Sequence, residues 1–193
     1  MDKLKRDDLF KLEDYATARA DFRAKVLAHK RTRSVALGGH ISLLFEDRLT
    51  VQYQIQEMLR VERIFEAGAI QDELDAYNPL IPDGGNLKAT MLIEYPDRDE
   101  RVRRLAELRG VERLVRLEIG GHGSAVVHAD EDLPRSNDDK TSAVHFLRFE
   151  LSAAQAQALR TGASVALAVD HPAYTATTVL PEPTRRALAA DLA

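Results

Sequence analysis

The sequence predicts an α+β protein whose sheet is mainly antiparallel. Short apolar runs flank glycine pairs at Gly38-Gly39 and Gly120-Gly121, the pattern of two tight hairpins. Segments with helical spacing of apolar residues separate the strands, without the regular strand–helix alternation of a parallel sheet. No low-complexity, proline-rich or repeated segment interrupts residues 1–193, so we expect one domain.

Helices dominate the expected elements of the first 80 residues. Residues 12–33 have apolar groups at helical spacing and end in cations, which suit the negative end of a helix dipole. The two strands of the first hairpin follow. The strongest helical pattern spans residues 49–66, and a shorter helix over 70–77 ends before Pro79. One face of the 49–66 helix carries Val51, Ile55, Met58, Leu59 and Phe65.

In residues 81–193 the sequence pattern predicts more strands than helices. We expect a strand over residues 87–95, a charged helix that Gly110 ends, and the second hairpin over 114–129. Further strands are expected over residues 143–151, 163–171 and 174–180. Helices are expected over 152–160, with Ser152 as the N-cap, and over 183–192.

Composition excludes several kinds of chemistry. The 193 residues contain no cysteine, which excludes disulfides, thiolate zinc sites, cysteine-ligated iron–sulfur clusters and a cysteine nucleophile. The formal charge of −4 gives no general attraction to nucleic acid or to an anionic membrane. The charged N-terminus does not resemble a signal peptide, and no apolar run approaches the roughly 20 residues of a membrane span. We therefore expect a soluble, cytoplasmic protein.

Common catalytic motifs are absent. The sequence has no phosphate-binding loop, dinucleotide fingerprint or nucleophile elbow. It also has no Glu-x-x-His, the helix motif of ferritin-like di-iron proteins. Any reactive site must therefore be assembled by the fold from residues that are distant in sequence.

Glu62 is the most conspicuous polar residue of the expected core. On a helical wheel it lies at the centre of the apolar stripe of the 49–66 helix. A carboxylate that faces a core is costly unless it is paired or bound to a metal. The favoured interpretation is an ion pair with Arg19, which interrupts the apolar face of the first helix. The alternative makes Glu62 a metal ligand or general base.

Four histidines are candidate partners of Glu62 in a metal site. They are His29, His40, His145 and His171. Imidazole and carboxylate groups suit iron, manganese or zinc. No local spacing supports the site, and each histidine has the alternative of a structural role. His145 shares a strand face with Leu147 and Phe149, which predicts a buried or half-buried ring.

Three charged or polar segments have weaker functional interpretations. An acidic loop contains Asp130, Glu131, Asp132, Asp138 and Asp139. It lacks the pattern of a calcium loop, so we expect a solvated loop. The basic cluster at residues 29–33 is weak evidence for nucleic acid on an acidic chain. Polar residues such as Gln54 along the 49–66 helix leave a homodimer interface as an alternative to a catalytic site.

Four long stretches carry a resemblance to a known family. They are ISLLFEDRLTVQYQIQEMLRVERIFE, LDAYNPLIPDGGNLKATMLIEYPD, DKTSAVHFLRFEL and VDHPAY, together with the N-terminal LEDY and the tail. They resemble the uncharacterised bacterial family DUF3501. The resemblance implies no activity, catalytic residue or cofactor. It implies a genomic context, beside genes for a rubrerythrin and an iron–sulfur protein similar to heterodisulfide reductase subunits.

Two hypotheses of function follow. The first, which is favoured, is a non-catalytic accessory protein that docks on, stabilises or regulates a rubrerythrin-type or iron–sulfur oxidoreductase of redox metabolism or the oxidative-stress response. The second is a metalloprotein in which Glu62 joins some of the four histidines around a non-haem iron or another divalent metal. The sequence leaves open whether such a protein is an enzyme.

Overall fold

The computed structural model describes residues 1–137 and 139–193, and it confirms the α+β class. Within these ranges the strands form two antiparallel sheets. The five-stranded sheet contains, in spatial order, β1 (Ser34–Leu37), β2 (Ile41–Phe45), β3 (Asn86–Ile93), β7 (Val144–Glu150) and β6 (Val126–Ala129). The four-stranded sheet contains β5 (Gly123–Ser124), β4 (Val115–Ile119), β8 (Val165–His171) and β9 (Tyr174–Val179). Both glycine pairs form hairpin turns, at β1–β2 and β4–β5, but the second hairpin is shorter than the predicted 114–129, because residues 126–129 pair with β7 in the other sheet.

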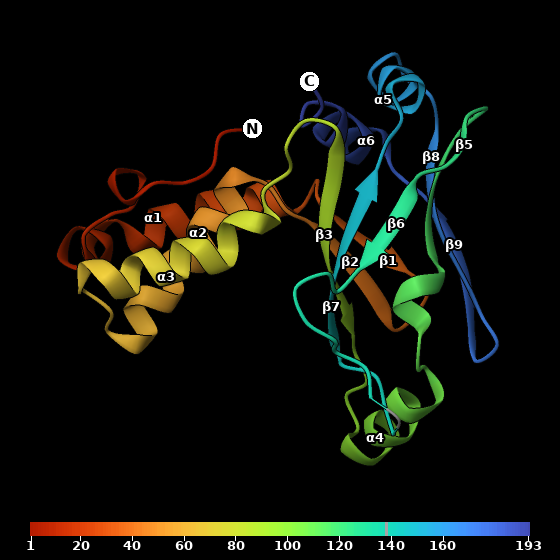
Figure 1. The fold of residues 1–193 in the computed structure, drawn as a ribbon, viewed down its shortest axis with the longest axis horizontal. Helices are drawn as coiled ribbons and strands as arrows, with labels where there is room; N and C mark the ends of the chain where they lie inside the picture. The colour runs from red at the N-terminus through yellow and green to blue at the C-terminus, as the bar shows by residue number, and fades with distance from the viewer. Residues whose placement is uncertain (138) are drawn as a thin grey trace.

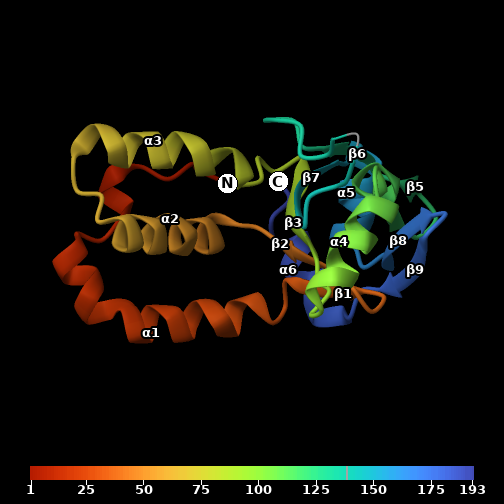
Figure 2. The ribbon, with the colours of Figure 1, turned by 90° about the horizontal axis from the view of Figure 1, so that it is seen from below.

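Three helices lie together on one flank of the sheets, and we call them the helical unit (Figures 1 and 2). They are α1 (Leu12–Lys30), α2 (Arg48–Glu62) and α3 (Ala67–Tyr77), with the short 3-10 helices η1 (Arg6–Asp8) and η2 (Asn78–Leu80) beside them. The unit has its own apolar core, built from Leu4, Val51, Ile55, Leu59, Leu74 and Ile81. The expected helices over 12–33, 49–66 and 70–77 are thus present with shifted ends.

The larger core lies between the two sheets. Strand β7 shows the alternation that builds it, because His145, Leu147 and Phe149 are buried while the residues between them are partly exposed. Leu117 of β4 and Leu167 of β8 face this core from the other sheet and are fully buried. The predicted inward direction of His145 is confirmed, since its side chain is 0 % exposed.

One segment connects the two sheets. Its first part, β5, pairs with β4, and its second part, β6, pairs with β7. Between the two parts, the Ala125 backbone N–H donates to the Leu117 carbonyl at 2.9 Å. The end of β6 therefore delivers the chain to the neighbourhood of His145.

The opposite edges of the sheets meet through side chains. The Tyr174 hydroxyl of β9 donates to the Leu37 carbonyl at 2.6 Å and accepts from the His40 N–H at 3.1 Å. Gly38 has a φ of +75°, and a Cβ there would lie 2.4 Å from the Tyr174 oxygen. This position needs glycine both for its backbone angle and for the close approach of Tyr174.

The remaining helices cover the ends of the sheets. They are α4 (Arg98–Glu107), η3 (Val111–Leu114), α5 (Ala153–Arg160) and α6 (Glu182–Ala189). In Figure 1, α4 lies at one end and α5 and α6 lie at the other. Ser152 caps α5 as predicted, with its Oγ accepting from the Gln155 N–H at 3.3 Å. Among the described residues no helix is long and apolar enough to cross a membrane.

The glutamines of α2 bind the N-terminal segment of the same chain. Gln56 is fully buried and exchanges two hydrogen bonds with the Phe10 backbone, at 3.0 and 3.1 Å. Gln52 donates to the Asp8 carbonyl at 2.6 Å. These two polar residues therefore fix an intrachain contact, while the homodimer on this helix stays a prediction.

Candidate functional site

One group of metal-ligand side chains comes together in the part of the chain that the structure describes. It consists of Glu112, Asp130 and His145, which each offer one donor atom, and these atoms all lie within 4.8 Å of one another. Glu112 comes from η3, Asp130 follows β6, and His145 lies on β7. The side chains are 4, 8 and 0 % exposed. We call this group the Glu–Asp–His cluster.

The His145 ring is held at both nitrogens. Nδ1 lies 2.6 Å from Asp130 Oδ2, while Nε2 lies 2.8 Å from Thr141 Oγ1 and 3.0 Å from the Ser142 carbonyl oxygen. A carbonyl oxygen can only accept, so the bond to Ser142 places a proton on Nε2. Nδ1 is the nitrogen that faces the Asp130 carboxylate.

The two carboxylates have different partners. Asp130 Oδ1 accepts from the Phe146 N–H at 2.9 Å, and the Arg135 guanidinium lies 3.5 Å away. The Asp130 backbone has a φ of +51°, an uncommon conformation for a residue other than glycine. Glu112 accepts from Ser136 Oγ at 3.2 Å and from Thr141 Oγ1 at 3.4 Å. The cluster therefore buries two carboxylates beside one imidazole.

Glu62 does not lie in the core, and this expectation was wrong. It is exposed at the last residue of α2. Arg19 pairs with Glu57 instead, through two hydrogen bonds of 2.8 Å. The Arg19 hydrogen bond, assisted by the Tyr15 hydroxyl, lowers the pKa of Glu57 to about 2. The carboxylate that the first helix binds is thus five residues earlier in the chain than predicted.

His29 lies at the edge of a second cluster, whose Arg33 and Asp47 side chains are buried and which joins the helical unit to the sheets. Its Nε2 lies 2.5 Å from Asp47 Oδ2, and Arg33 Nε lies 2.9 Å from the same oxygen. Arg33 also forms a bidentate pair with Asp191, with both N–O distances at 2.7 Å. Burial raises the pKa of Asp191 although Arg33 opposes this. Asp47 in addition caps α2, accepting from the Thr50 N–H at 2.9 Å.

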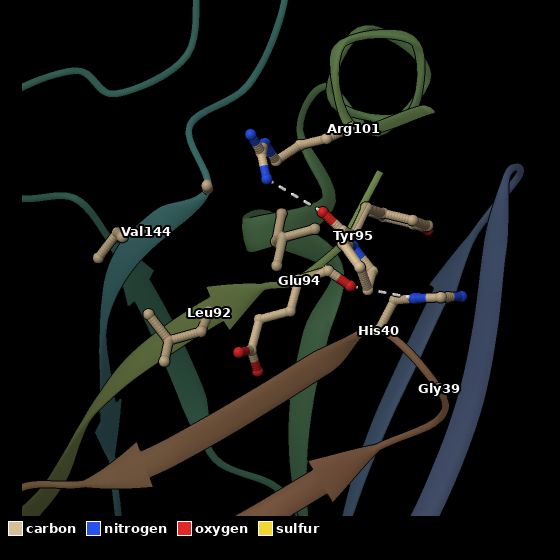
Figure 3. A pocket seen from close by; sticks show the side chains of 10 residues that line it. Gly39, His40, Leu92, Glu94, Tyr95, Arg101 and Val144 are labelled. Carbon is tan, nitrogen blue, oxygen red and sulfur yellow. Dashed lines mark hydrogen bonds between the residues drawn. The ribbon is translucent and has the colours of Figure 1, made fainter. Parts of the chain in front are cut away.

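His40 lines an open groove of 770 Å³ at the end of β3 (Figure 3). Its ring stacks on Tyr95 with 4.0 Å between centroids, and Nδ1 donates to the Glu94 carbonyl at 3.1 Å. Arg101 donates to the Tyr95 carbonyl at 3.1 Å. Figure 3 shows His40, Arg101 and the Glu94 carboxylate pointing in different directions. The groove therefore gathers no common point at which these groups could act together.

His171 has a structural environment. It is 8 % exposed, its Nε2 donates to the Arg109 carbonyl at 3.1 Å, and its Nδ1 accepts from the Ala173 N–H at 3.1 Å. Of the five candidates from the sequence, only His145 thus lies in the Glu–Asp–His cluster.

The sequence does not predict that Glu112 and Asp130 are the partners of His145. Glu112 was not singled out, although a glutamate between Val111 and Leu114 in an apolar context was an available signal. Asp130 was assigned to a solvated acidic loop, yet its side chain is only 8 % exposed. Glu131, Asp132 and Asp139 of that loop are exposed as expected, and Asp138 lies outside the described residues.

Fold and site together define a two-sheet α+β protein with a buried carboxylate–imidazole cluster and a separate helical unit. The model of the family described as "Protein of unknown function (DUF3501)" matches residues 3–192, and the chain belongs to this family. The crystal structure at 1.90 Å of a protein of unknown function from Burkholderia pseudomallei K96243 is similar, with 47 % identity, a TM-score of 0.95 and 100 % of each chain covered. No curated protein matches the chain.

Proposed function

We propose that the protein binds one divalent metal ion at Glu112, Asp130 and His145. The observation that carries this proposal is the convergence of three buried ligand side chains from three separate elements. One imidazole and two carboxylates suit iron, manganese or zinc. The ion would lie between His145 Nδ1 and Asp130 Oδ2, with Glu112 as the third ligand.

The donor set fits such an ion with a small adjustment. Metal–ligand distances of about 2.0–2.2 Å put donor atoms at most about 4.4 Å apart, and the three donor atoms already lie within 4.8 Å of one another. The 2.6 Å between His145 Nδ1 and Asp130 Oδ2 would widen to admit the ion. His145 Nε2 already donates to the Ser142 carbonyl, and such a bond commonly orients a metal-binding imidazole. Because the three side chains are buried, the ion would fix the loop between Asp130 and His145 rather than meet a substrate.

Metal analysis tests this proposal. Protein purified without chelators or a histidine tag is expected to contain close to one iron, manganese or zinc per chain. The variants His145→Gln and Glu112→Gln are expected to lose at least about tenfold in metal affinity, because each removes a ligand. The measurement is elemental analysis, followed by titration of the metal-free protein with each ion.

Two variants outside the cluster serve as controls. His171→Asn removes a different buried imidazole, and Glu62→Ala removes the exposed carboxylate of α2. Both are expected to keep the wild-type metal content. Absence of saturable binding by the wild type, or equal binding by all four variants, would count against the cluster as a metal site.

We also propose that the helical unit docks on a rubrerythrin-type or iron–sulfur oxidoreductase of the kind that the family resemblance implies. Its free end exposes Phe10, Val61 and Phe65, which are 37, 65 and 68 % exposed. Several large apolar side chains exposed on one end of a molecule favour a protein-binding surface. The proposed role is accessory, and it requires no reaction at the metal site.

Complex formation tests this second proposal. The chain is mixed with a purified rubrerythrin and with an iron–sulfur protein similar to heterodisulfide reductase subunits, the two partners that the family resemblance implies. The masses are measured by light scattering after gel filtration. We expect a complex with one of them that Val61→Ser/Phe65→Ser weakens at least tenfold. Val179→Ser, at an equally exposed residue of β9, should leave it intact. A homodimer alone, or no complex, would contradict the proposal.

A further inference from the structure

A cavity of 410 Å³ lies where the helical unit meets the outer face of the five-stranded sheet. The end of α3 and η2 form one wall, and β3, β7 and the loop after β6 form the other. Figure 2 shows the end of α3 directed toward β3 and β7. The volume lies in the usual range of small-molecule sites, roughly 300–1,000 Å³.

The two walls of this cavity are largely apolar. Tyr77, Pro79 and Leu80 face it from the helical unit, and Phe146 faces it from β7. The Arg135 guanidinium lies over the Phe146 ring, 4.4 Å from its centroid. The cavity therefore offers flat and aliphatic surfaces to the body of a ligand.

Most charges of the cavity are already matched. Arg135 pairs with Asp132, with Nη2 2.7 Å from Oδ2. Arg148 pairs with Glu131, with Nε 2.8 Å from Oε2. Lys88 is the exception within residues 1–137 and 139–193, because no carboxylate oxygen of these residues lies within 4.0 Å of its Nζ. The lining carries three cations and two carboxylates, and Asp130 and Glu150 beside it also pair with Arg135 and Arg148, so Lys88 is the cation without a carboxylate in direct contact.

Lys88 is held in a position where it can bind an anion. Its Nζ donates to the Pro79 carbonyl at 2.6 Å, and an ammonium group has three hydrogens to donate. Burial, with the nearby charges of Lys3 and Arg148, lowers the pKa of Lys88, although the carboxylates of Asp83 and Glu131 oppose this. An anion in the cavity would supply the partner that the ammonium group lacks.

We propose that this cavity binds a small monocarboxylate with an aromatic or branched apolar body. Lys88 binds the carboxylate, and the body packs between Leu80 and Phe146. A phosphate dianion is disfavoured, because the cavity has one unmatched cation and two carboxylates that repel a second negative charge. The site lies on the opposite face of β7 from the Glu–Asp–His cluster, because Phe146 and His145 point to opposite faces, and Arg135 contacts both sites.

Binding of 4-fluorophenylacetate, followed by fluorine NMR, tests the proposal. We expect saturable binding by the wild type and at least tenfold weaker binding by Lys88→Met. Lys25→Met, at an exposed lysine of α1, should bind as the wild type does. Thermal unfolding of each variant shows that the fold is kept, and Phe146→Ala, which removes part of the apolar wall, should also weaken binding.

Two further probes, and control of the metal state of the protein, test the charge of the ligand and separate this proposal from the metal proposal. The neutral 4-fluorophenylacetamide is expected to bind at least tenfold more weakly, and inorganic phosphate should not displace the carboxylate. Wild type, Lys88→Met and Lys25→Met are compared in the same metal state, so failure of the metal proposal would not mimic failure here. Equal binding of acid and amide, displacement by phosphate, or unchanged affinity in Lys88→Met would overturn the proposal.

Discussion

Replacing Arg33 by methionine is expected to lower the free energy of unfolding by about 3–5 kcal/mol. Methionine is similar in length and apolar, so the change removes the charge with little loss of packing. The Arg33 side chain is 5 % exposed, and its carboxylate partners Asp191 and Asp47 are 3 and 8 % exposed. Without the guanidinium these carboxylates stay buried without their main cation, which leaves a large desolvation cost uncompensated.

Denaturant unfolding at pH 7 measures this loss, with Arg186→Met as the matched control. Arg186 pairs with Glu182, but both side chains are exposed, at 74 and 52 %, so its loss should cost less than about 1 kcal/mol. The double variant Arg33→Met/Asp191→Asn should recover part of the stability, because it removes one of the orphaned carboxylates. A loss below 1 kcal/mol in Arg33→Met would contradict the role of this junction.

The loss of unfolding free energy in Arg33→Met should also depend on pH. Burial already raises the pKa of Asp191 in the folded protein. When the pKa of a carboxyl group is higher in the folded protein than in the unfolded chain, the protonated carboxyl stabilises the folded state. This contribution to stability is lost as the pH rises through the folded-state pKa. With Arg33 removed the shift increases, so the deficit is expected to be smaller near pH 4.5 than at pH 7. The same unfolding experiment at both pH values checks this direction.

Phe149→Ala is expected to cost about 3–5 kcal/mol, since it opens a cavity between the two sheets. Phe149 is 0 % exposed and packs against Phe45 with 6.0 Å between ring centroids. Phe65→Ala makes the same chemical change at a side chain that is 68 % exposed, and should change stability by less than about 0.5 kcal/mol. Unfolding midpoints of the two variants, measured together, check the contrast. Similar losses in both would place Phe65 in a core and contradict this structure.

The pair Phe149 and Phe65 shows where sequence patterns succeed and fail. Phe149 was placed correctly because strand alternation continues without interruption along β7. A single helix over residues 49–66 predicts that Phe65 and Glu62 lie on its buried apolar stripe. The helix ends at Glu62, and Arg63 adopts a left-handed φ of +56°, so Phe65 no longer follows the helical phase. Glu62 still follows the helical periodicity of α2, but its side chain is exposed, because no neighbouring element of the described residues packs over it.

The Glu–Asp–His cluster shows a second limit. The inward direction of His145 could be read from its strand, because side chains alternate with a period of two. Its partners lie 15 and 33 positions earlier in the chain, and no spacing rule relates them to it. Asp130 reaches His145 because β6 pairs with β7, and the Asp130 N–H donates to the Phe146 carbonyl at 2.8 Å. Glu112 is brought by η3, which packs near β6 at the end of the sheets.

The sequence by itself determined the α+β class, the two glycine hairpins, the Ser152 cap and the exclusion of cysteine chemistry. These properties depend on composition or on neighbours a few positions apart, for which backbone periodicity and turn geometry suffice. Only the tertiary structure decided that Arg33 binds Asp191, that Lys88 faces a cavity, and that Glu112 and Asp130 meet His145. Such contacts join residues far apart in the chain, and their geometry is set by strand register and helix packing, which no local pattern specifies.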